Sequence, residues 1–257
     1  MTTTVGASAG LAGTVYGYLG TSGWIANVVN GFPPQTPTDE CFTLCHALKD
    51  SYIRASSMAT VGGNLTWYSE TCGMDLDSFC SLASTASPGC GGVVFMPHLS
   101  GERSPFIDPN ARSCFIGLSA STSKPEMCRS VLEGIAFGVK SLMGPLGVDV
   151  KEMIIVGGMT KSDVFLQILA DVLGINLVVL KCSEHVATLG AAIQTGVELG
   201  WYKSLVPTGG EHFAVLKKVQ TEEANKAVYD STYGVYKSLY PSLKGAFSSL
   251  ASIHTSD

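Results

Sequence analysis

Residues 153–180 read MIIVGGMTKSDVFLQILADVLGINLVVL, and this stretch decides the fold. Met153–Val156 is a short apolar run that predicts a buried strand. The apolar spacing then predicts a helix over Ser162–Leu173, which Gly174 ends, and Asn176–Leu180 predicts a second strand. Another helix is expected over Val186–Leu199. This β-α-β-α order indicates an α/β domain whose strands share one sheet.

Outward from this stretch, the first third of the chain favours strands followed by a helix. Short runs rich in β-branched and aromatic residues predict three strands, with a tight turn at Gly20–Gly23 between the first two. A helix is expected over Gly62–Thr71. The three predicted strands are Thr14–Leu19, Trp24–Val29 and Tyr52–Ser57.

The middle of the chain is expected to be an insertion. Residues 73–92 hold many Ser, Gly and Ala and favour an irregular connection. Lys124–Met143 predicts a long helix that Ser123 caps. With residues 73–150 set aside, the order β-β-β-α-β-α-β-α predicts a mixed five-stranded sheet flanked by helices. Residues 203–257 are expected to form a helical tail.

The composition excludes several classes of protein. The chain has 257 residues, is 46% apolar and only 14% charged, and carries a net charge of -5, which argues against a nucleic-acid or anionic-membrane partner. No apolar run approaches the ~18 residues of a membrane span. The first residues lack the basic charge of a signal peptide, so a cytoplasmic location is expected. The low charge indicates a partner surface, either for another domain or for a second copy in a homodimer.

The eight cysteines indicate no metal site. They are scattered, and no Cys-x-x-Cys pair occurs. They are best interpreted as free thiols.

Three glycine turns mark the candidate binding residues. They are Leu19–Gly23, Val61–Asn64 and Val156–Met159, and each follows a short apolar stretch. Glycine turns of this kind bring backbone N–H groups close to phosphates. Taken singly, each is also compatible with an ordinary hairpin turn or with a helix entry that needs glycine for packing.

Six blocks of sequence, in order, resemble the C-terminal domain of the FGGY carbohydrate kinases, and most closely the xylulokinase-like members. The similarity runs from about Val5 to Tyr202. The blocks are Leu19–Gly23, Phe42–His46 with Val61–Trp67, Leu99–Pro105 with Asp108–Arg112, Ser113–Leu118 with Glu126–Glu133, Val156–Met159 with Gln167–Asp171, and Leu189–Ala192. The resemblance implies a ribonuclease-H-like fold of the actin-type ATPases, with residues 1–257 as a single domain.

The resemblance also implies a site for ATP with Mg²⁺. Gly20, Thr21 and Ser22 would form the phosphate loop, with Thr21 at the β- or γ-phosphate. Gly62 and Thr66 would border the nucleotide. The third turn would receive the adenosine: Gly157 and Gly158 as a flat surface for adenine, Met159 packed against it, and Ser162 as a polar contact where family members often carry Asn.

Charged residues elsewhere have two interpretations. Glu102, Arg103, Asp108 and Arg112 could act in catalysis, but an ion-pair network that orders a long loop is favoured. The dispersed His46, His98 and His185 are interpreted as structural. Glu133 lies among small and apolar residues and is expected to be a buried, hydrogen-bonded acid.

The expected catalytic base lies outside the sequence. By the resemblance, an Asp that takes the proton from the sugar hydroxyl belongs one or two residues before Met1, and a sugar-binding N-terminal domain belongs before that. The sequence therefore predicts the ATP-binding half of a carbohydrate kinase, with a xylulose-like substrate favoured and no activity alone. The alternative is a non-catalytic nucleotide-binding or interaction module, or a truncated gene product.

Overall fold

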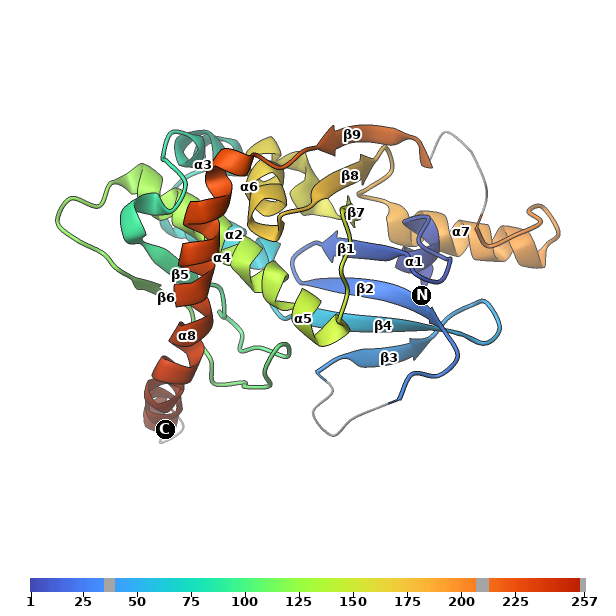
Figure 1. Cartoon of the computed structure of the whole chain (residues 1–257), viewed down its shortest axis with the longest axis horizontal. Coiled ribbons are helices and arrows are strands. Elements are labelled where there is room, and N and C mark those ends of the chain that lie inside the picture. The colour runs from blue at the N-terminus through green and yellow to red at the C-terminus, as the bar shows by residue number, and fades with distance from the viewer. Residues whose placement is uncertain (35–39, 207–212, 255–257) are drawn as a thin grey trace.

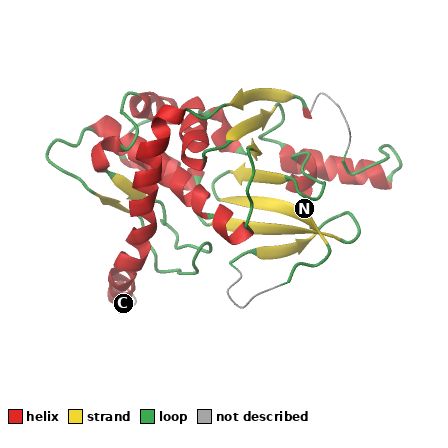
Figure 2. Cartoon of the chain, viewed as in Figure 1, coloured by secondary structure: helices red, strands yellow, loops and turns green. Residues whose placement is uncertain are grey.

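Seven strands form one mixed sheet with helices on both faces (Figures 1 and 2). The computed structural model describes residues 1–34, 40–206 and 213–254, and the statements below concern these residues. In spatial order the strands are β3 (Phe42–Cys45), β4 (Ser51–Met58), β2 (Gly23–Asn30), β1 (Val15–Leu19), β7 (Glu152–Val156), β8 (Asn176–Leu180) and β9 (Val215–Val219).

The central strand β1 joins the two halves of the sheet. It pairs antiparallel with β2, where Tyr18 faces Trp24, and parallel with β7, where Tyr18 faces Val156. The meander β1-β2-β4 and the parallel pair β7-β8 are the five predicted strands, so the mixed α/β fold is confirmed. The count of five is wrong, because β3 and β9 extend the two edges.

Both added strands are exposed, which explains why the sequence pattern gives little sign of them. Phe42 and Leu44 of β3 are 47% and 50% exposed, and β9 has no fully buried residue. An edge strand with little burial lacks the apolar alternation that marks an inner strand.

Helices cover the two faces of the sheet unequally. The larger cluster of buried side chains lies between one face and helices α2, α4 and α6, and the smaller lies under α1 and α7. The helices are α1 (Thr2–Gly6), α2 (Gly62–Thr71), α3 (Leu76–Ser84), α4 (Lys124–Ser141), α5 (Met143–Leu146), α6 (Asp163–Leu173), α7 (Val186–Glu198) and α8 (Glu223–His254). A second, two-stranded sheet pairs β5 (Val94–Met96) with β6 (Cys114–Ile116).

Helix α4 belongs to the core rather than to an insertion beside it. It begins with a capping box: the Glu126 carboxylate accepts from the Ser123 amide at 2.7 Å, and the Ser123 hydroxyl accepts from the Glu126 amide at 3.4 Å. Every residue from 128 to 139 is buried, because α3, α6 and β5 pack around it.

The stretch 73–92 is more regular than predicted. Helix α3 forms because the Asp75 carboxylate accepts from the Ser78 amide at 2.8 Å and so caps its first turn. Phe79 and Ala83 then point into the core. Small residues favoured a loop in the sequence, whereas the cap and two apolar positions one helical turn apart are enough for a helix.

The C-terminal segment contributes a strand as well as a helix. After β9, helix α8 runs from Glu223 to His254 and buries Tyr229, Tyr236 and Phe247. Residues 207–212 and 255–257 of the expected 203–257 tail lie outside the described residues. Among the helices that are described, none has the length and apolar character needed to cross a membrane.

Candidate functional site

The three glycine turns meet at one edge of the sheet. β1, β4 and β7 run in the same direction, because β4 and β1 are both antiparallel to β2 and β7 is parallel to β1. Their carboxyl ends therefore reach the same edge, where ligands of open α/β sheets bind. The turn at Gly20 follows β1, the turn at Gly62 follows β4, and the turn at Gly157 follows β7.

The first two turns are joined by hydrogen bonds. The amides of Val61 and Gly63 donate to the Thr21 carbonyl at 2.7 and 3.1 Å, and the Gly62 amide donates to the Gly20 carbonyl at 2.9 Å. The first amides of α2 are thus occupied. This corrects the expectation that the N-terminus of this helix offers its N–H groups to phosphate.

The hairpin tip keeps its donors available instead. Thr21 and Ser22 are exposed, and among the described residues none accepts a hydrogen bond from their amides. The carbonyls of Gly20 and Thr21 face α2, and the Ser22 carbonyl accepts from the Gly20 amide at 2.9 Å. Since its acceptors point inward and its amides and hydroxyls are free, the tip is suited to an anion.

Gly62 is the point where all three turns touch. A Cβ built on it would lie 2.8 Å from the Gly20 carbonyl oxygen and 3.2 Å from the Met159 sulfur. A side chain there would separate the hairpin from the third turn. Met159 itself is 7% exposed, and Thr66, one helical turn beyond Gly62, is exposed.

The two glycines of the third turn have different roles. Gly157 has φ +104°, its amide donates to the Ser183 carbonyl at 2.9 Å, and a Cβ would overlap the Leu19 carbonyl. It needs to be glycine for packing. Gly158 is exposed, and a Cβ on it would meet no atom within 4 Å. Of the two, only Gly158 offers a free backbone surface to a ligand.

Ser162 is engaged by the protein. Its hydroxyl accepts from the Phe165 amide at 3.2 Å, which caps α6, and donates to the Cys80 sulfur at 3.3 Å. Burial raises the pKa of the Cys80 thiol. The hydroxyl of Ser162 is therefore a helix cap first.

The acidic loop between β5 and β6 is held by hydrogen bonds rather than by ion pairs among its own charges. The buried Glu102 carboxylate accepts from the Ala59 and Arg103 amides, both at 2.9 Å, and lies 3.0 Å from His98 Nδ1. Asp108 accepts from the Asn110 amide and from the Tyr240 hydroxyl. Arg112 donates to the carbonyls of Pro109 and Ala111. The expected ion-pair network among these side chains is therefore wrong for the described residues, and hydrogen bonds hold the loop instead.

Two pairings of polar side chains were not predicted from the sequence. His98 is buried against Glu102, four residues later in the chain. Both residues lie in a loop, where a separation of four does not predict a contact. Glu133, a buried acid as predicted, accepts from Arg129 Nε at 2.8 Å, from the Tyr229 hydroxyl at 3.0 Å and from the Gly89 amide at 3.1 Å. The i, i+4 spacing of Arg129 and Glu133 could have shown the first of these contacts.

The described residues offer no cluster of His, Cys, Asp or Glu side chains that could hold a metal ion. A divalent cation at this edge would be held by the phosphates of a nucleotide, by water and by the hydroxyls of Thr21 and Ser22.

The mixed sheet and its flanking helices define a class: domains of the actin-like ATPase type, as found in sugar kinases. Residues 29–199 match the model of the FGGY family of carbohydrate kinases, C-terminal domain. The chain belongs to this family.

Individual relatives agree with this assignment. The xylulose kinase of Staphylococcus epidermidis is 29% identical over 241 residues, which cover 91% of this chain and 48% of that protein. The solved structure of a xylulose kinase from Lactobacillus acidophilus gives a TM-score of 0.87 at 27% identity, over 97% of this chain and 51% of that one. A gluconate kinase structure from the same organism gives 0.86 at 27% identity, over 97% and 51%. The chain spans about half the length of these relatives.

Proposed function

We propose that this chain is the ATP-binding half of a carbohydrate kinase that transfers the γ-phosphoryl group of ATP to a sugar or polyol hydroxyl. The observation that carries the proposal is the free hairpin tip at Thr21 and Ser22, held by hydrogen bonds to α2 and in contact, through Gly62, with Met159. A xylulose-like substrate is favoured because xylulose kinases are among the relatives.

Each turn has its own task in this proposal. The amides and hydroxyls of Thr21 and Ser22 bind the terminal phosphates and hold them during transfer, which depends mostly on positioning and charge stabilisation. Gly158 receives the adenine ring on its open backbone, and Met159 supports the ring from the side of Gly62. Mg²⁺ arrives with the nucleotide and neutralises part of the phosphate charge.

The site is tested by calorimetric titration of the chain with Mg²⁺-ADP, comparing the natural protein with Gly158→Val. A Cβ at this position meets no protein atom within 4 Å, so the fold should tolerate a side chain there while adenine loses its place. We expect weak binding by the natural chain and at least a tenfold loss in the variant, about 1.4 kcal/mol.

A matched control is Gly234→Val, at an exposed glycine of α8 that also has open space around it. This variant should bind Mg²⁺-ADP like the natural chain, and both variants should melt as folded proteins. Equal binding by Gly158→Val and the natural chain would rule out the third turn as the adenosine site.

The 257-residue chain alone is expected to phosphorylate no sugar. Transfer needs a base for the proton of the acceptor hydroxyl, and general-base help contributes about 10²–10⁴-fold. The carboxylates of Glu102 and Asp108 already accept hydrogen bonds from their own loop, from the Ala59 amide and from α8. ATP consumption with D-xylulose, glycerol, L-ribulose and gluconate measures this. Sugar-dependent turnover above about 1 s⁻¹ would contradict the expected inactivity of the chain alone.

A further inference from the structure

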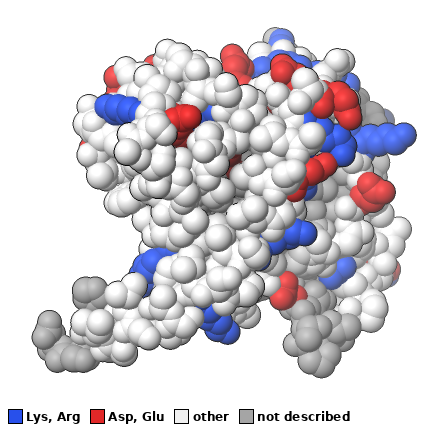
Figure 3. Space-filling model, turned by 60° about the vertical axis from the view of Figure 1, so that its left-hand side comes forward, with Lys and Arg blue, Asp and Glu red and all other residues white. Residues whose placement is uncertain are grey.

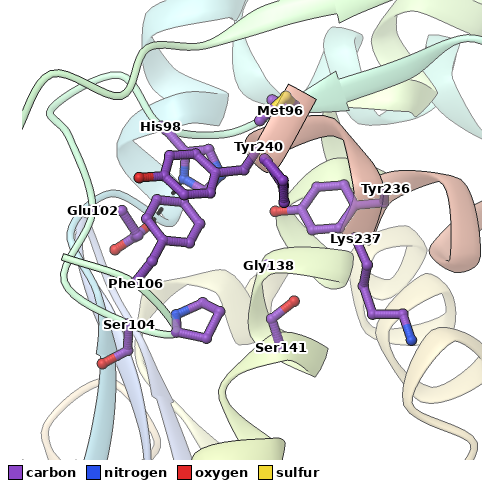
Figure 4. A pocket seen from close by; sticks show the side chains of 12 residues that line it. Met96, His98, Glu102, Ser104, Phe106, Gly138, Ser141, Tyr236, Lys237 and Tyr240 are labelled. Carbon is purple, nitrogen blue, oxygen red and sulfur yellow. Dashed lines mark hydrogen bonds and ion pairs between the residues drawn. The ribbon is translucent and has the colours of Figure 1, made fainter. Parts of the chain in front are cut away.

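A cavity lies between α8, α4 and the loop that follows β5 (Figure 4). Its volume is ≈ 140 Å³, and it shares no residue with the three glycine turns. A cavity of about 150 Å³ with apolar walls is large enough for a benzene molecule. The space is therefore that of a small ring compound or of a few water molecules.

One side of the cavity is a fixed apolar wall. Met96, Pro105, Phe106 and Pro241 contribute carbon surface to it. The Phe106 ring stacks on the Tyr240 ring with 3.4 Å between centroids, and the Tyr240 hydroxyl donates to Asp108 at 2.9 Å. Because Asp108 anchors Tyr240 and Tyr240 supports Phe106, the wall is rigid enough to select a flat molecule.

The opposite side carries a tyrosine hydroxyl that has no partner among the described residues. Tyr236 is 6% exposed, and Figure 4 shows its hydroxyl pointing into the cavity from α8. No described residue forms a hydrogen bond with this hydroxyl. Burial raises the pKa of Tyr236 well above its usual value, so the group keeps its proton. A hydroxyl that faces a cavity without a protein partner favours a ligand or water that can pair with it.

Two acceptors accompany this hydroxyl. Pro241 has no N–H, so the Lys237 carbonyl, one turn earlier in α8, lacks its helical donor. His98 lines the cavity and has its Nδ1 3.0 Å from the Glu102 carboxylate. The Glu102 carboxylate also lines the cavity and is the second acceptor. The cavity thus combines a donor with acceptors beside a flat apolar wall.

We propose that this cavity is a binding site for a small ring compound that carries one hydroxyl group, of the chemical class of phenol. The ring packs on the wall formed by Phe106 and Pro105. Its hydroxyl accepts from Tyr236 and donates to one of the neighbouring acceptors, which no purely apolar molecule of that size can do. Figure 3 shows Lys, Arg, Asp and Glu side chains spread over the visible face of the molecule.

The test uses the whole chain and 4-fluorophenol, whose fluorine NMR signal shifts or broadens on binding. We expect saturable binding that unlabelled phenol displaces. Tyr236→Phe removes only the hydroxyl and should weaken 4-fluorophenol binding at least fivefold. Tyr202→Phe, at a half-exposed tyrosine outside the cavity, is the matched control and should bind like the natural chain.

Two further measurements decide what the hydroxyl does. 4-Fluorotoluene fits the same space but has no hydroxyl. It should bind the natural chain more weakly than 4-fluorophenol does. The natural chain and Tyr236→Phe should bind 4-fluorotoluene equally well. The melting temperature of Tyr236→Phe without ligand should not fall, because no protein partner is lost. The proposal is overturned if 4-fluorophenol does not bind and the cavity holds water only, if Tyr236→Phe binds it as the natural chain does, or if 4-fluorotoluene binds the natural chain equally well.

Discussion

Gly6 and Gly190 face each other across the crossing of α1 and α7. A Cβ on Gly6 would lie 3.0 Å from the Gly190 amide nitrogen, and a Cβ on Gly190 would lie 2.9 Å from the Gly6 amide nitrogen. Each would also overlap a backbone carbonyl, of Val186 and of Thr2. The two helices touch backbone to backbone, so the small residues of the Leu189–Ala192 block have a packing role.

Gly190→Ala is therefore expected to destabilise the domain, although alanine favours helix formation. Overpacking costs about 1–3 kcal/mol, and a backbone neighbour that cannot move away places the loss at the upper end. Urea unfolding followed by circular dichroism measures it. Gly234→Ala, at an exposed glycine of α8, should instead gain up to about 1 kcal/mol. Equal stability of Gly190→Ala and the natural chain would show that the helices can separate.

Thr21→Val tests the hairpin tip, because valine keeps the shape of threonine and removes the hydroxyl. A hydrogen bond to a charged group contributes about 1.5–3 kcal/mol, so the affinity for Mg²⁺-ADP should fall about tenfold or more. Adenosine, which lacks phosphates, should bind both proteins alike. Thr195→Val, at an exposed position of α7, is the control. A parallel loss for adenosine and ADP would mean that the substitution disturbs the site rather than a phosphate contact.

Arg129→Met should be strongly destabilising. It leaves the Glu133 carboxylate buried without its cationic partner, although the Tyr229 hydroxyl and the Gly89 amide still donate to it. The loss of one partner of a buried pair costs about 3–5 kcal/mol. Lys226→Met breaks the exposed contact with Asp230 and should cost less than about 1 kcal/mol. Chemical denaturation of both variants gives the comparison, and similar losses in the two would contradict this account.

His46 should make the stability depend on pH. It is 8% exposed, its Nδ1 accepts from the Leu48 amide at 3.0 Å, and burial lowers its pKa below the usual value. The unfolded chain therefore binds more protons than the folded one below about pH 6.5, and stability falls as the pH decreases through that value.

The measurement is the unfolding free energy between about pH 7.5 and 5.5 for the natural chain and for His46→Gln. The variant should lose part of the decrease. His185→Gln, at an exposed histidine, should keep it. An unchanged decrease in His46→Gln would assign the effect to other groups.

Local signals predicted the inner elements well. Ser123 and Gly174 mark helix ends through contacts within one turn, so α4 and α6 could be located from the sequence. The edge strands could not, because Phe42 and Leu44 face outward and carry no pattern of burial. The pairing of Glu133 with Tyr229 joins residues 96 positions apart and depends on where α8 packs, which no local pattern contains.

The residues of the candidate site were predicted one by one from the resemblance. Which of them pack against the protein and which stay open to a ligand was not predicted. The sequence treats Gly157 and Gly158 alike, whereas only the structure shows that one packs against Leu19 and the other is open. Likewise, the amides of α2 were expected to be free. Their use by the Gly20 and Thr21 carbonyls depends on the register of β2 against its two neighbours, β1 and β4.

The three hydrogen bonds from the amides of residues 61–63 to the Gly20 and Thr21 carbonyls also make the hairpin tip and α2 one mechanical unit. A displacement of Thr21 pulls on the amides of Val61 and Gly63, and hence on a helix whose Tyr68 is wedged between the rings of Phe79 and Phe115. A force applied at the hairpin tip is therefore transmitted through α2 to the aromatic side chains of the core.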